Sequence, residues 1–84
     1  MKLCPGDFVV LERMAAQLLS DSFQLSEGPS PSYVSRVVGE FTIDQLGFVL
    51  EVHREGQPSE EEFAKILTPI GIGWLNVYYL EKAE

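Results

Sequence analysis

The sequence is poor in the residues from which disulfide frameworks and metal sites are built. Its 84 residues include one cysteine, Cys4, and one histidine, His53. A single cysteine excludes an internal disulfide and a multi-thiolate zinc site, and a single histidine excludes a site with several imidazole ligands. No apolar run approaches the roughly 20 residues that span a bilayer, and no secretory leader is visible. We therefore expect a protein without metal or other cofactor, cytoplasmic, neither secreted nor held in a membrane.

Basic residues are also scarce. Six Lys and Arg face 13 Asp and Glu, which gives a net charge of −7. Residues 1–42 hold five acids and three bases, whereas residues 43–84 hold eight acids and three bases, so the second half carries −5. Nucleic-acid binding draws on Lys and Arg that neutralise phosphates, and the bases here form no run. We expect no direct binding to DNA or RNA.

What is present is globular composition, with 45% hydrophobic and 23% charged residues. A chain this short forms one domain with a small core, so residues 1–84 are predicted to be a single domain. Catalytic motifs are missing: there is no Gly-x-Ser-x-Gly elbow and no phosphate-binding loop. His53 lies between Glu51 and Glu55 on one predicted strand face, which is typical of a solvated polar surface. We expect a protein that is not an enzyme.

The first half combines a strand-like and a helix-like pattern. Pro5-Gly6-Asp7 predicts a turn, and residues 8–11 are a β-branched apolar run suited to a strand. Apolar residues then recur at helical spacing from Arg13 to Phe23. The alternative is one continuous helix over residues 8–20 with Asp7 as its N-cap. Residues 26–32, with two prolines, predict a loop before the strand-rich half.

The second half alternates in the manner of β-strands. Residues 33–43 predict a strand with a bulge or a tight bend at Gly39 and with Val37 and Phe41 on one face. The next strand is expected to turn Phe48, Leu50 and Val52 toward the core.

Residues 59–68 carry two competing patterns. Ser59 and Glu62 form a capping box, and apolar spacing after them favours a short helix. The alternative is a strand from Phe63 to Leu67 that turns at residues 68–71 and returns antiparallel, a geometry that the flanking glycines suit.

Two stretches resemble small SH3-like barrel proteins of bacteria and phages. Those proteins often open with a Pro-Gly-Asp-hydrophobic strand, as residues 5–11 do, and close with Gly-Trp, a short 3₁₀ turn and a Leu-Glu strand, as the end of 46–82 does. The resemblance implies a mainly β (α+β) SH3-like barrel with a helical insertion at about 12–32. It also implies a strand at Phe63 and places Trp74 in the core as its largest anchor.

The expected function is therefore protein binding without catalysis, by a small structural or assembly component such as a phage head, tail or cement protein. The alternative is an acidic regulator or inhibitor that occupies the basic groove of a nucleic-acid-binding protein. The partner is another protein or copies of the chain itself, in a homo-oligomer or a larger assembly. The hydrophobic candidates for partner binding are Leu18, Leu19, Phe23, Tyr33, Tyr78 and Tyr79, and the acidic candidates are Glu51, Glu55, Glu60, Glu61 and Glu62.

Overall fold

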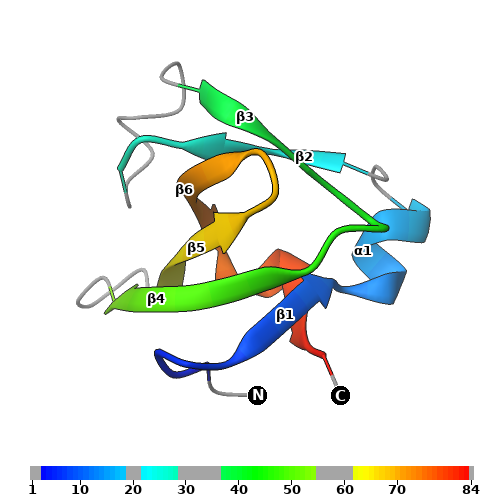
Figure 1. Ribbon diagram of the computed structural model, residues 1–84. Helices are drawn as coiled ribbons and strands as arrows, with labels where there is room; N and C mark the ends of the chain where they lie inside the picture. The colour runs from blue at the N-terminus through cyan, green and yellow to red at the C-terminus, as the bar shows by residue number, and fades with distance from the viewer. Residues whose placement is uncertain (1–2, 19–21, 29–36, 55–61, 84) are drawn as a thin grey trace.

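The computed structural model describes residues 3–18, 22–28, 37–54 and 62–83, and within them the chain is mainly β (Figure 1). Seven strands form one antiparallel sheet in the order β3-β2-β6-β5-β4-β1-β7, curled into a half-barrel. The elements in chain order are β1 (Phe8–Leu11), α1 (Arg13–Leu18), β2 (Ser22–Ser26), β3 (Val37–Thr42), β4 (Gly47–Arg54), β5 (Glu62–Thr68), β6 (Gly71–Asn76), the 3₁₀ helix η2 (Val77–Tyr79) and β7 (Leu80–Lys82).

The predicted turn before β1 is confirmed, and its residues explain its shape. Pro5 and Gly6 occupy the central positions, and the Asp7 amide donates to the Cys4 carbonyl at 3.1 Å. Gly6 has a φ of 99°, which a side chain would disfavour and which a type II turn requires at its third position. The turn delivers the chain into the strand predicted for residues 8–11, now β1.

In the described part of residues 59–68 the strand is confirmed, since β5 covers Glu62–Thr68. Residues 59–61 lie outside the described residues. β5 turns directly into β6. The Thr68 hydroxyl donates to the Gly71 carbonyl at 2.8 Å and accepts from the Ile70 amide at 3.2 Å. The tertiary pairing with β4 and β6 outweighs the local helical spacing in this segment.

The core lies inside the curl of the sheet and draws on all seven strands. β5 contributes residues at alternate positions, because successive side chains point to opposite faces. The buried apolar side chains are Leu3, Val9, Leu11, Leu25, Phe41, Val49, Ala64, Ile66, Leu75 and Leu80.

A β-bulge in β4 overturns the predicted orientation of that strand. The register with β5 shifts between Val49 and Glu51, so Leu50 is an extra residue. Val49 is fully buried and Val52 packs against the core, whereas Leu50 is exposed and Phe48 is half-buried. A bulge places two residues opposite one and so changes which residues face inward, which strict alternation cannot anticipate.

A second irregularity corrects the prediction for β3. In its pairing with β2, Gly39 lies opposite Leu25 and Val37 lies opposite Ser26, so Val38 is an extra residue. The sequence predicts an irregularity at the neighbouring Gly39. Because of this extra residue, Val37 is exposed while Phe41 is fully buried, so the two do not share the core face.

The helical insertion predicted for about 12–32 is wrong. In the described part of that range, α1 covers only the six residues Arg13–Leu18, and Ser22–Ser26 form strand β2. β2 pairs with β3 and with β6, so the segment is part of the sheet. Phe23 is therefore a strand residue, since sheet pairing outweighs a helical pattern that is short and marginal on its own.

Trp74 is also not the core anchor that the resemblance implies. It is half-buried on the outer face of β6, because its neighbours Gly73 and Leu75 face inward. Its ring meets the ring of His53 edge-on, with centroids 6.4 Å apart.

The close approach of β6 to β2 yields a stability prediction from two glycines. A Cβ on Gly73 would lie 2.6 Å from the Leu25 Cβ, which is fixed to the backbone, whereas a Cβ on Gly39 would lie 2.7 Å from the Ile70 Cδ1, the end of a flexible side chain. We expect Gly73→Ala to lower the free energy of unfolding by about 1–3 kcal/mol. Gly39→Ala, the matched control, should change it by less than about 1 kcal/mol, since Ile70 can rotate away. Urea denaturation of both variants measures the difference, and equal midpoints would contradict the role of Gly73.

Candidate protein-binding site

Three of the hydrophobic candidates meet at one end of the half-barrel. Phe23 of β2 stacks on Tyr79 of η2 with ring centroids 4.4 Å apart and an interplanar angle of 15°. Tyr78 meets Tyr79 edge-on at 5.5 Å. We refer to Phe23, Tyr78 and Tyr79 as the aromatic end. These residues are distant in sequence, and it is the β2–β6 pairing that brings them together.

The aromatic end is held in place by short polar contacts around η2. The Asn76 side chain caps η2 by accepting from the Tyr78 amide at 2.9 Å. The Glu12 amide donates to the Tyr79 carbonyl at 2.7 Å, which ties η2 to the end of β1. Tyr79 packs against the core, while Tyr78 is 75% exposed. The result is a solvent-facing ring on a fixed backbone.

The remaining hydrophobic candidates do not bear on this site. Leu19 and Tyr33 lie outside the described residues, and so does the side chain of Leu18 at the end of α1. No contact of theirs with the aromatic end is described.

The acidic candidates that are described each lie opposite a base. Glu51 is directly across the β4–β5 ladder from Lys65. Glu62 forms an ion pair with Arg54 at 3.4 Å. Glu55, Glu60 and Glu61 lie outside the described residues. The described part of the predicted acidic surface is thus interleaved with positive charge.

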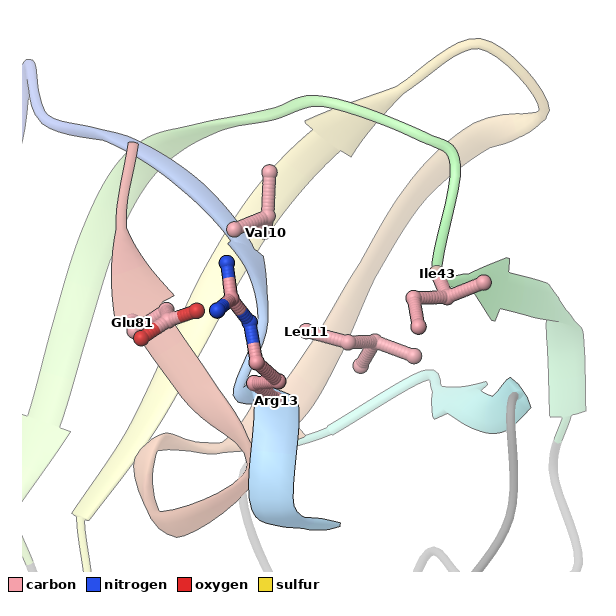
Figure 2. Close-up of a pocket in the computed structure, with 5 residues that line it drawn as sticks. All are labelled: Val10, Leu11, Arg13, Ile43 and Glu81. Atoms are coloured by element: carbon pink, nitrogen blue, oxygen red, sulfur yellow. The ribbon is translucent and has the colours of Figure 1, made fainter. Parts of the chain in front are cut away.

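A pocket that sequence analysis missed lies beside β1 and β7 (Figure 2). Its volume is about 260 Å³, and it is lined by Val10, Leu11, Arg13, Ile43 and Glu81. Figure 2 shows the Arg13 side chain extending toward Glu81 between apolar walls. Its residues come from three distant stretches of the chain, 10–13, 43 and 81, so no local sequence signal could have found it.

Comparison with protein-family models, with curated proteins and with solved structures finds no match to this chain. The geometry itself supports a mainly β chain whose curled antiparallel sheet is consistent with a β barrel. Among residues 3–18, 22–28, 37–54 and 62–83, no helix has the length and apolar character to cross a membrane. The same residues hold no cluster of three or more His, Cys, Asp or Glu that could bind a metal ion.

The cap on η2 gives the second prediction. Asn76→Ala removes the acceptor for the Tyr78 amide, and we expect it to lower the free energy of unfolding by about 1 kcal/mol. Asn76→Asp keeps an acceptor oxygen and should retain most of that stability. Thermal unfolding of the two variants beside the wild type makes the comparison. If the Asp variant were destabilised as much as the Ala variant, the cap would not be what holds η2.

Proposed function

We propose that this chain is a non-enzymatic protein-binding module built on an SH3-like barrel, and that it serves as a structural or assembly component such as a phage head, tail or cement protein. Its place of action would be the cytoplasm or the virion. The elements around the residues that carry the resemblance support the proposal: the turn at Pro5 and Gly6 leads into β1, and Trp74 of β6 is followed by a 3₁₀ helix and a short last strand.

The observation that carries the proposal is the exposure of Tyr78. A tyrosine has few rotatable bonds, so burying it against a partner costs little conformational entropy and gives both apolar area and a hydroxyl for hydrogen bonding. Here the Tyr78 backbone is fixed by Asn76, and its ring lies against Tyr79, which itself stacks on Phe23. Such a preorganised, exposed aromatic residue is typical of the centre of a protein interface.

The alternative function, an acidic inhibitor of a nucleic-acid-binding protein, has support from the net charge of −5 in residues 43–84. It draws less support from the described surface, because Glu51 lies opposite Lys65 and Glu62 is paired with Arg54. The two functions differ in salt dependence. An apolar contact resists added salt, whereas steering by surface charge is screened.

The test is an affinity capture from native lysate with wild-type and Tyr78→Ala chains, washed at low and at high salt. We expect wild type to retain coat or other particle proteins at high salt, and Tyr78→Ala to retain them at least about tenfold less. Met14→Ala is the control, because Met14 is also well exposed, at 63%, but lies on α1. Quantitative mass spectrometry reads the result.

Two outcomes would count against the proposal. Capture of a polymerase, nuclease or DNA-binding protein that is released at high salt would favour the acidic inhibitor. Equal capture by Tyr78→Ala and wild type would show that the aromatic end is not part of the interface.

A further inference from the structure

An uninterrupted row of apolar side chains crosses the outer face of four neighbouring strands. Phe8 of β1 lies directly opposite Phe48 of β4, Phe48 opposite Leu67 of β5, and Leu67 opposite Ile72 of β6. Residues directly opposite in antiparallel strands point to the same face of a sheet. The four side chains therefore form one line across β1, β4, β5 and β6, which we call the outer apolar row.

The outer apolar row is open to solvent. Phe8 is 50% exposed, and Leu67 and Ile72 are each 45% exposed. Phe8 and Phe48 contact each other edge-to-face with centroids 5.1 Å apart, and Leu50 of the β4 bulge adds further exposed apolar surface beside them. At about half exposure, five side chains of this size present roughly 400 Å². A patch of that size is often functional.

This area matches the need of a small stable interface. A standard interface buries about 800 Å² on each partner, and roughly 60% of it is apolar. The outer apolar row and Leu50 supply most of the apolar area that such an interface needs. The polar residues around them supply its polar area. No charged residue interrupts the row, although the chain as a whole carries a net charge of −7.

The charged residues beside the outer apolar row are complementary to the same residues of a second copy of the chain. Glu51 on β4 and Lys65 on β5 are opposite each other in the next outward-facing position after the row. Lys65 forms no ion pair with the residues that the structure describes, in contrast to Arg54 and Lys82, which pair with Glu62 and Asp7. A two-fold rotation that exchanges β4 and β5 would place Glu51 of one copy over Lys65 of the other, and Lys65 over Glu51.

We propose that the outer apolar row is the contact surface between two copies of this chain, related by a two-fold axis that runs parallel to the strands between β4 and β5. Phe48 of each copy then packs on Leu67 of the other at the centre of the contact, and Phe8 and Ile72 lie at its edges. Such an isologous contact uses one patch twice, which only a second copy with the same row can satisfy. It also lets two copies with a charge of −7 meet without bringing their acidic residues against each other.

This inference deepens the proposed function, because it names one partner of the assembly component, but it depends on a different surface from the aromatic end. The two can therefore fail separately. Loss of capture by Tyr78→Ala with an intact dimer would leave the outer apolar row as the dimer contact.

The first test is the mass of the full chain by sedimentation equilibrium over a concentration range of about 100-fold. We expect a reversible dimer. Leu67→Glu should raise the dissociation constant at least about tenfold, because a charge would be buried at the centre of the contact. Met14→Glu is the matched control: it adds the same charge at an exposed apolar side chain of α1, outside the outer apolar row, and should leave the dimer unchanged. A wild type that is monomeric throughout, or a Leu67→Glu chain that dimerises like wild type, would overturn the proposal.

Circular dichroism establishes that the variants are folded. If Leu67→Glu does not fold, Ile72→Thr takes its place, since threonine suits a strand and still removes apolar surface from the row. It should also weaken the dimer, and an unchanged dissociation constant for a folded Ile72→Thr chain would contradict the proposal.

Substitutions of Glu51 and Lys65 test the direction of the two-fold axis. Glu51→Lys should weaken the dimer, because it would place two positive charges together across the contact, and the combined Glu51→Lys and Lys65→Glu chain should recover it. A two-fold axis along the row would bring Phe48 onto Phe48 and leave Glu51 far from Lys65 of the second copy. Failure of the double variant to recover the dimer would exclude the arrangement between β4 and β5.

Discussion

The fold depends on one close backbone approach, where Gly73 of β6 passes Leu25 of β2. β2 pairs with β6 at a single residue pair, Ser26 with Trp74, so this approach is what joins the β2–β3 hairpin to the rest of the sheet. A side chain at position 73 would push the two strands apart. The curl of the sheet, the burial of Leu25 inside it and the stack of Phe23 on Tyr79 all require that the strands stay close. The absence of a side chain on Gly73 therefore stabilises both the core and the aromatic end.

The bulge in β4 has the second large effect, because it decides which apolar residues become surface. Without the extra residue, strict alternation from Phe48 onward would have continued through Leu50 and Val52 on one face. With it, Val49 and Val52 both serve the core, while Phe48 and Leu50 lie outside. A protein of this size can bury few side chains, so apolar residues left on the outer face carry a cost in solubility that a binding role would explain.

Local chemistry made much of the fold predictable, and long-range pairing explains what was not. The turn at Pro5 and Gly6, strand β1 and the return after Thr68 follow from glycine, proline and β-branched residues that act on their immediate neighbours. The spacing of residues 13–23 predicts a helix that includes the start of β2, because the pairing of β2 with β3 and β6 leaves no trace in that spacing. Tyr78 is a candidate from the sequence alone, because adjacent aromatic residues are visible in it. Its stack with Phe23, the pocket at Arg13 and the outer apolar row join distant segments, so they needed the structure.

The position of β1 between β4 and β7 sets the order in which this chain can fold. β7 pairs with β1 from Val9 to Leu11, so the last strand must return across nearly the whole described length to meet the first. The β4–β5–β6 meander has only local connections and can form early, but β1 gains its second neighbour only when Leu80–Lys82 has left the ribosome. Because such non-local pairings slow folding, we expect the sheet to be completed in milliseconds to seconds rather than in microseconds.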